Sequence, residues 1–437
     1  MEVSVRNFGT ISHAEVHVGG LTVITGENDT GKSTIGKILF SLVKASARYE
    51  EDLEEAKEAR IKDIAERMYF NIRRYVNVAS HLEFRELFHP RKFYSQLRLD
   101  KAKALDERVA FVTHLMEIDK NMPTALYESL MRRLEKISLI MDEPDDEIYV
   151  ITRAVKKAFF SEFKGEIIHK GGKAPSKAHV TINDGASELI DITWSKDQMQ
   201  NFKYVDSLGY ADATYVDSPA IIQFHRLVKM ARTLFDADSS GVGTVPLHIK
   251  DLATKLSDSV YNFPVPDFFV EREQEVDISS RIKKVFGGSL SYDDDSSDFV
   301  LERNGYKLSS GNIASGIKSL GVLDLLVRGG SIKKNSLLIL DEPEVNLHPK
   351  WQLDYCDIVC GLVASGVDVI VTTHSPYILE ALKHYSDKYG LGGAFYLASK
   401  EPNASSDFLD ISQNISVAID RLAAPLYLLN KESFDDF

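Results

Sequence analysis

The sequence predicts an α/β fold with three parts: a mostly parallel sheet, an antiparallel β subdomain and an inserted helical domain. Residues 287–400 alternate between strand-like and helix-like runs, which is the order typical of a parallel sheet. Residues 165–217 change to β patterning around Asn183-Asp184-Gly185, a hairpin turn signal. Residues 46–164 are rich in Glu, Lys, Arg, Ala and Leu and follow helical periodicity, but their heptads are not sustained. We therefore expect packed helices there rather than a long coiled coil.

We expect four segments along the chain. The first and the last form one head, the second is a helical insertion, and the third combines the β subdomain with a helical lobe. In that order they are residues 1–45, 46–164, 165–286 and 287–437. The 437 residues, of which 44% are hydrophobic and 27% charged, are enough for two or three domain-sized cores.

A glycine-rich segment near the N-terminus fits the phosphate-loop pattern GxxxxGK(S/T). It runs from Gly26 to Ser33, follows a β-patterned run at residues 21–25 and precedes a helix-compatible run at residues 34–40. This order places phosphates at a helix N-terminus, which favours anions, whereas a glycine turn with an incidental lysine would not need such flanks. The residues predicted to bind the nucleotide through this loop are Gly26, Asn28, Asp29, Thr30, Gly31, Lys32, Ser33 and Thr34.

The segment Ser336–Glu342 is an apolar run that ends in two carboxylates. Taken alone, it is equally well explained as a strand with a solvated end. Lys32 changes that reading, because a lysine at the outer phosphates needs a Mg²⁺ site and a group that activates water. Ser33 and Asp341 are the predicted Mg²⁺ ligands, and Glu342 is the predicted base. The chain is thus predicted to be a P-loop NTPase whose site is assembled from both ends of the sequence.

The residues around these acids resemble a known family. Asp341-Glu342-Pro343-Glu344-Val345-Asn346-Leu347-His348-Pro349 is similar to the Walker B and D-loop segment of ABC-type ATPases in the RecF, OLD and SMC branch. Residues 367–376 resemble the next strand and the switch histidine of these proteins, here His374. Residues 314–318 are similar to their signature, and residues 5–11 to the first strands, which support the adenine. The resemblance covers residues 1–45 and 287–400.

The resemblance implies ATP and Mg²⁺ as ligands and a homodimer, or a higher homo-oligomer, formed through the heads. Each ATP would lie between the phosphate loop of one subunit and Ser315 and Gly316 of the other, with His374 at the γ-phosphate. The usual signature begins Leu-Ser-Gly-Gly, whereas this one reads Ala-Ser-Gly. We prefer Ser315 to Leu308-Ser309-Ser310-Gly311 because an apolar helix-like run follows it; the alternative for Ser315 is an ordinary helix cap. Gln223 is either the Q-loop residue or a surface glutamine.

Charge and composition bear on partners and location. The net charge of −13 disfavours a surface that binds nucleic acid everywhere, although a local basic face would suffice. The best local candidate is His89–Arg98, which is either a DNA or partner contact that includes Arg91, Lys92 and Arg98, or simply a helix surface. Cys356 and Cys360 exclude a disulfide framework and are expected to be buried rather than to bind metal. No apolar run approaches 18 residues, so we expect a cytoplasmic protein without a membrane segment.

Three functions are compatible with these features. The leading hypothesis is an ATPase subunit of a bacterial anti-phage defence system, similar to OLD-related ATPases, that controls a separate effector such as a nuclease. We expect no nuclease domain in this chain, because no suitable acidic constellation follows residue 400. The second hypothesis is a RecF-like DNA-repair ATPase that binds DNA directly, and the third is a nucleotide-gated scaffold with little turnover.

Overall fold

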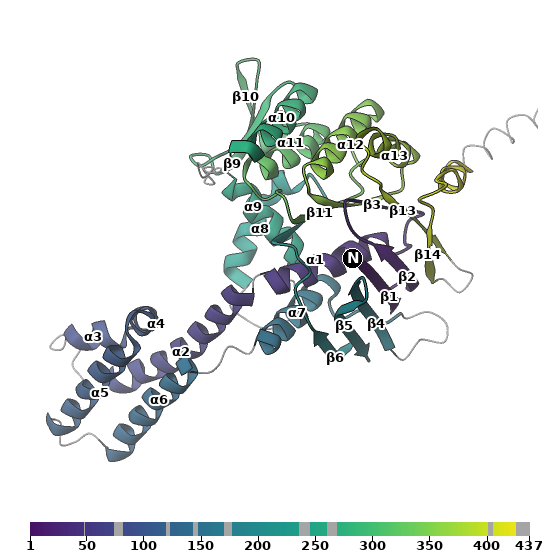
Figure 1. Ribbon diagram of the computed structural model, residues 1–437. Helices are drawn as coiled ribbons and strands as arrows, with labels where there is room; N and C mark the ends of the chain where they lie inside the picture. Colours follow the sequence, from purple (N-terminus) through teal and green to yellow (C-terminus); the bar gives the residue numbers. More distant parts are fainter. Residues whose placement is uncertain are drawn as a thin grey trace, which may run out of the picture. The chain divides into compact units, whose positions relative to one another are not determined.

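The computed structural model describes residues 1–47, 49–73, 82–118, 123–142, 147–169, 177–235, 245–259, 269–400 and 405–424. The chain divides into two compact units (Figure 1). The first, called the head below, comprises Met1–Ala47 and Thr152–Phe437, and the second, the helical unit, is Arg48–Ile151.

One large sheet organises the head. Within the described residues it has eleven strands in the order β6-β5-β4-β1-β2-β14-β13-β3-β12-β11-β7. Their bounds are β1 (Glu2–Phe8), β2 (Ile11–His17), β3 (Leu21–Gly26), β4 (Lys177–Asp184), β5 (Ser187–Ser195), β6 (Gln198–Tyr204), β7 (Asp212–Val216), β11 (Ser336–Asp341), β12 (Asp368–Thr373), β13 (Ala394–Lys400) and β14 (Ser406–Asp410).

The sheet has a parallel and an antiparallel part, which confirms the predicted fold class. Strands β7, β11, β12, β3 and β13 are parallel neighbours, so their carboxyl ends meet at one edge. Strands β6, β5, β4, β1 and β2 are antiparallel, and the turn at Asn183-Asp184-Gly185 joins β4 to β5 as expected. The antiparallel part is not local to residues 165–286, because β1 pairs with β4 through Val3–Ile182 and Val5–Val180.

Helices cover both faces of the parallel part: α1 lies on one face, and α12 and α13 lie on the other (Figure 1). A small sheet of β8, β9 and β10 packs with α11 and α8. The bounds are α1 (Lys32–Ala47), α7 (Glu147–Phe163), α8 (Ile221–Phe235), α9 (Leu247–Asp258), α10 (Phe269–Phe286), β8 (Ser289–Asp293), β9 (Asp298–Arg303), β10 (Tyr306–Ser309), α11 (Ser315–Arg328), α12 (Pro349–Ala364) and α13 (Pro376–Tyr389).

The two cysteines belong to the core of the head. Cys356 and Cys360 lie one turn apart on α12 and are both buried against α13, with their Sγ atoms 3.9 Å from the Ile378 oxygen and 4.0 Å from the Leu382 oxygen. Burial raises the pKa of Cys360 to about 12, so this thiol stays protonated. The expectation that these residues act as small hydrophobes is confirmed.

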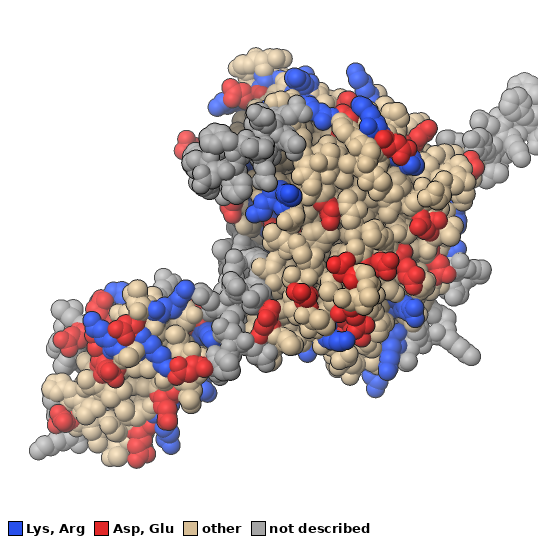
Figure 2. Space-filling view, in the orientation of Figure 1, with Lys and Arg blue, Asp and Glu red and all other residues tan. Residues whose placement is uncertain are grey.

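The helical unit has its own apolar core. Its elements are α2 (Tyr49–Arg73), α3 (Leu82–Phe88), α4 (Pro90–Leu99), α5 (Lys101–Ile118) and α6 (Thr124–Asp142). Of the basic and aromatic residues in α4, Phe93 and Tyr94 are buried in this core, and Lys92 pairs with Glu86 at 2.7 Å. On the face shown in Figure 2, basic and acidic side chains are interspersed over this unit. These aromatic rings therefore cannot stack on bases, which removes the stacking part of the nucleic-acid alternative.

Among the described residues, none of the helices combines the length and the apolar character that a membrane crossing requires.

Candidate nucleotide-binding site

The phosphate loop connects β3 to α1 and needs glycine at two positions. Gly26 and Gly31 have φ angles of 144° and 81°, where side chains are strained. A Cβ atom on Gly26 would lie 2.2 Å from the Ala398 carbonyl oxygen, and one on Gly31 would lie 2.6 Å from Cγ1 of Ile11. Asp29 has a φ of 62°, a left-handed conformation that aspartate tolerates better than most residues. The loop is thus held close to β13 and β2.

Lys32 is the first residue of α1 and its side chain folds back over the loop. The ammonium donates to the carbonyl oxygens of Gly26 at 3.0 Å and Glu27 at 2.7 Å. Burial lowers the pKa of Lys32, and the nearby carboxylates of Glu342 and Asp341 oppose that effect. A cation that has already lost water and faces an open cavity is well placed to bind phosphate oxygens.

Asp341, at the end of β11, is surrounded by hydroxyl groups. Ser33 donates to Oδ1 at 2.8 Å, Thr372 donates to the same oxygen, and Tyr215 donates to Oδ2 at 2.7 Å. The contact between Ser33 and Asp341 brings together the two predicted Mg²⁺ ligands. A hydroxyl and one carboxylate suit Mg²⁺, which takes its remaining ligands from phosphates and water. The described residues contain no cluster of three or more His, Cys, Asp or Glu side chains that could hold a metal ion.

Glu342 follows directly and has a left-handed backbone, with a φ of 49°. Such a conformation costs on the order of 1–3 kcal/mol and is often kept where it orients a functional side chain. Its N–H donates to the Thr372 carbonyl oxygen at 3.0 Å, and its Oε1 lies 3.4 Å from Nδ1 of His374. The carboxylate reaches the same cavity as the phosphate loop.

Glu344 has a role that the sequence did not reveal. It is 6% exposed, and its Oε1 accepts hydrogen bonds from the Thr373 hydroxyl at 2.6 Å, the His374 N–H at 2.9 Å and the Ser375 N–H at 3.2 Å. The carboxylate therefore fixes the loop that carries His374. The available signal was a third acid close behind Asp341 and Glu342 in a segment where most acids would be solvated.

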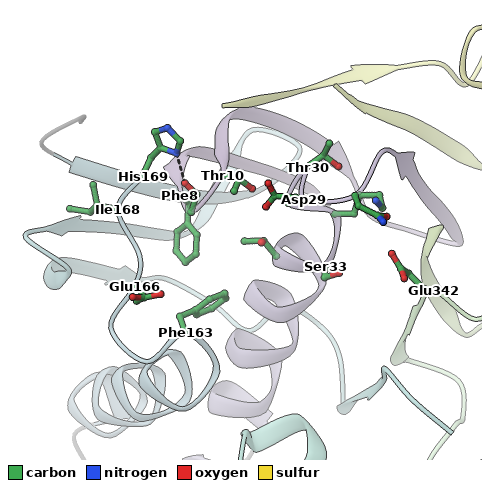
Figure 3. Close-up of a pocket in the computed structure, with 15 residues that line it drawn as sticks. Phe8, Thr10, Asp29, Thr30, Ser33, Phe163, Glu166, Ile168, His169 and Glu342 are labelled. Carbon is green, nitrogen blue, oxygen red and sulfur yellow. Dashed lines mark hydrogen bonds between the residues drawn. The ribbon is translucent and has the colours of Figure 1, made fainter. Parts of the chain in front are cut away.

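A cavity of about 610 Å³ is lined by the phosphate loop, with Lys32 and Ser33, and by Glu342. Phe8 and Phe163 lie at its apolar end, with ring centroids 5.0 Å apart in an edge-to-face arrangement (Figure 3). His169 lies beside them and shares a hydrogen bond of 2.6 Å between Nδ1 and the Gly9 carbonyl oxygen. The sequence pointed to the phosphate end of this cavity but not to its far wall. The lining residues that it missed are Phe163, Glu166, Ile168 and His169.

Ser315 and Gly316 are absent from the described residues that line this cavity. Ala314 is the N-cap of α11, so Ser315 is an exposed first helical residue and not the cap that the alternative required. Gly316 is buried; a Cβ atom there would lie 3.1 Å from the Trp351 ring. Gln223 accepts a hydrogen bond of 3.0 Å from Lys318.

The comparisons with known proteins agree with this geometry. Residues 1–199 match the family model described as "AAA ATPase domain", and residues 224–380 match "AAA domain, putative AbiEii toxin, Type IV TA system". The chain carries AAA-family ATPase domains. These ATPase domains include the phosphate loop in the first match and Asp341, Glu342 and His374 in the second. The comparison with curated proteins gave no match.

The chain is also similar in fold to solved structures of SMC heads. One is an SmcHead bound to the C-winged helix domain of ScpA, with 11% identity, a TM-score of 0.44 and coverage of 95% of this chain and 98% of that chain. Another is the SMC head domain from Thermotoga maritima, with 11% identity, a TM-score of 0.38 and coverage of 94% and 97%. A third is an Smc head with an extended coiled coil bound to the C-terminal domain of ScpA derived from Pyrococcus furiosus, with 12% identity, a TM-score of 0.40 and coverage of 96% and 97%.

Proposed function

We propose that this protein binds and hydrolyses ATP with Mg²⁺, and that ATP closes a head-to-head dimer which controls a separate effector. One observation carries the first part: Lys32 and Glu342, from opposite ends of the sequence, line a single cavity, and Ser33 in the same lining donates a hydrogen bond to Asp341.

Each group has a chemical task in hydrolysis. Lys32 and the loop N–H groups neutralise the outer phosphates, and Glu342 orients and deprotonates the attacking water. His374, held beside Glu342, faces the γ-phosphate. Ser33 and Asp341 would hold Mg²⁺, which neutralises charge on the phosphate oxygens when bound.

The proposed dimer is argued from the polar groups and apolar side chains that a single head leaves exposed. Ser315 offers an exposed hydroxyl and free N–H groups at the start of α11, and none of these reaches the cavity of its own chain among the described lining residues. Exposed apolar side chains flank the catalytic segments: Val345 is 44% exposed and Tyr377 is 59% exposed. A second head that brings its Ser315 to the γ-phosphate would cover such side chains.

The control of an effector in anti-phage defence is supported by the second family description, which names an AbiEii toxin. The buried rings of Phe93 and Tyr94 speak against the direct DNA-repair alternative, since they remove the stacking part of the basic segment.

Purified protein tests the proposal. We expect ATP hydrolysis that requires Mg²⁺, is abolished by Glu342→Gln and is not stimulated by DNA. Glu302→Gln, which changes an exposed acid on β9, is the matched control and should keep full turnover. Co-expression with the adjacent gene product should yield an ATP-dependent complex. Strong stimulation by DNA would favour the repair function, and ATP-dependent assembly without turnover would favour a scaffold.

A further inference from the structure

A buried histidine between two carboxylates lies behind the nucleotide site. His248 of α9 approaches Glu162 of α7 with Nδ1 at 2.6 Å from Oε2, and Asp217 with Nε2 at 3.2 Å from Oδ2. The backbone N–H of His248 also donates to Oε1 of Glu162 at 2.9 Å. The side chains of Glu162 and His248 are 0% and 3% exposed, whereas that of Asp217 is 30% exposed.

Both ring nitrogens of His248 face carboxylate oxygens, so both must carry a proton for both hydrogen bonds to form. Burial alone would lower the pKa of His248, but the hydrogen bonds and charges of Asp217 and Glu162 outweigh it and raise the pKa to about 8. The ring is therefore an imidazolium at neutral pH.

Each carboxylate belongs to a segment of the nucleotide site. Glu162 immediately precedes Phe163, which lines the apolar end of the cavity. Asp217 follows β7, whose Val216 pairs with Leu340 on β11, so Asp217 lies beside Asp341 at the strand ends. Asp217, Asp341 and Glu342 line one small cavity.

A second path leads from His248 to the metal-binding aspartate. The ring of Tyr215 lies 4.9 Å from the ring of His248, and its hydroxyl donates to Oδ2 of Asp341 at 2.7 Å. The ring of Phe40 on α1 lies edge-to-face with both rings, with centroids 6.1 Å from Tyr215 and 6.4 Å from His248. The segments that carry Phe40, Tyr215 and Glu162 therefore meet at His248.

We propose that His248 is a positioning residue for the nucleotide site, which ties the wall of the apolar end to the strand end beside Asp341 by donating one N–H to Glu162 and the other to Asp217. This role rests on the proposed ATPase function. His248 touches no reacting atom; it holds the Phe163 wall and the carboxylate segments in one arrangement.

Two lysines and two aspartates on the packed elements form a separate charged set. Lys44 of α1 contacts Asp212 and Asp251 at 2.6 Å each, and Lys255 contacts the same two carboxylates at 2.7 and 3.1 Å. Two cations and two anions make this set neutral. The charge on His248 is therefore set by Glu162 and Asp217, with Tyr215 as its neutral neighbour.

The sign of the pH dependence follows. The pKa in the folded protein, about 8, lies above the ordinary value of 6.5, so the stabilisation is complete below pH 6.5 and is lost as the pH rises through 8. The proton that leaves is the one on Nε2, because Asp217 is the more exposed and more distant partner. Asp217 then loses its hydrogen bond to His248, and the strand end beside Asp341 is no longer tied to α9.

Steady-state kinetics between pH 6.5 and about 9 test the proposal. In the wild type, kcat should fall about tenfold as the pH passes 8, with KM for ATP changed by less than about twofold. His248→Gln should show the low kcat at every pH, because its single amide nitrogen can face only one carboxylate and its amide oxygen would face the other. His225→Gln is the matched control, because His225 is also fully buried but faces the carbonyl oxygens of Ile222 and Ser297. The kcat of this variant should still fall at alkaline pH as it does in the wild type.

Thermal unfolding without nucleotide separates this proposal from the ATPase function. The loss of Tm caused by His248→Gln should be largest below pH 6.5 and shrink above pH 8. If the loss of Tm caused by His248→Gln does not change with pH, the proposed bridge of charged His248 between Glu162 and Asp217 is overturned. If His248→Gln shows the expected Tm pattern but keeps the pH profile of kcat seen in the wild type, His248 is merely structural and the positioning role is overturned. A wild type that shows the stability pattern but neither binds nor hydrolyses ATP would refute the proposed function, and the positioning role with it.

Discussion

Lys32 depends on residues that are far apart in the sequence. Its charge faces a cavity whose other end is formed by Phe163, and the two carboxylates that act on it most strongly, Glu342 and Asp341, come from residues beyond position 340. In this structure its ammonium donates to two loop carbonyl oxygens. ATP must replace these weak partners with phosphate oxygens, which is a favourable exchange for a buried cation.

Lys32→Ala should therefore abolish ATP binding. Calorimetry should show nucleotide binding reduced to background, because the site would lose its point charge at the β- and γ-phosphates. Lys37→Ala, on the same helix but outside the cavity lining of the described residues, should bind ATP like the wild type. An unchanged affinity in Lys32→Ala would refute the phosphate-loop assignment.

At the scale of elements, the sequence predicted what depends on local pattern. The helical periodicity of residues 46–164 reappears in helices that include α2, α5 and α6. The pairing of β1 with β4 was not predictable, because the sequence pattern of a strand does not indicate which strand it pairs with about 180 residues away. The same holds for the cavity wall at Phe163–His169 and for Glu344, whose roles arise only when distant segments meet.

The basic segment of α4 shows a second limit of prediction from the sequence. Basic and aromatic residues in alternation fit both a nucleic-acid surface and an amphipathic helix, and only the packing of Phe93 and Tyr94 into a core decides the role of the rings. The basic side chains Lys92 and Arg98 remain exposed. We therefore expect this surface to contact a partner by charge rather than by stacking.

Charge reversal at Arg91, Lys92 and Arg98 should leave basal ATP hydrolysis within about twofold of the wild type and weaken partner binding. The reason is that the helical unit has its own core and carries none of the described residues that line the nucleotide cavity. Turnover and co-purification with the effector are the two measurements. A collapse of basal turnover in a variant that still folds would place this unit in the catalytic machinery.

At the scale of the whole molecule, the proposed function leaves the site of one chain incomplete. Lys32 and Glu342 line one cavity, His374 contacts Glu342, and Ser315 is exposed and is missing from the described lining. The proposed function therefore requires a second head. Glu342→Gln, which blocks hydrolysis, should be trapped as a dimer by ATP and remain a monomer with ADP in a sizing experiment.

The mixing of two inactive variants tests this requirement most directly. Ser315→Arg and Lys32→Ala should each disable both sites of their own homodimer. A mixed dimer, however, contains one site with both lesions and one with neither. If each ATP lies between Lys32 of one subunit and Ser315 of the other, mixing should restore up to about half of the wild-type turnover per mixed dimer. Rescue is the predicted result; no rescue, together with a Glu342→Gln protein whose size never changes with ATP, would contradict the shared site.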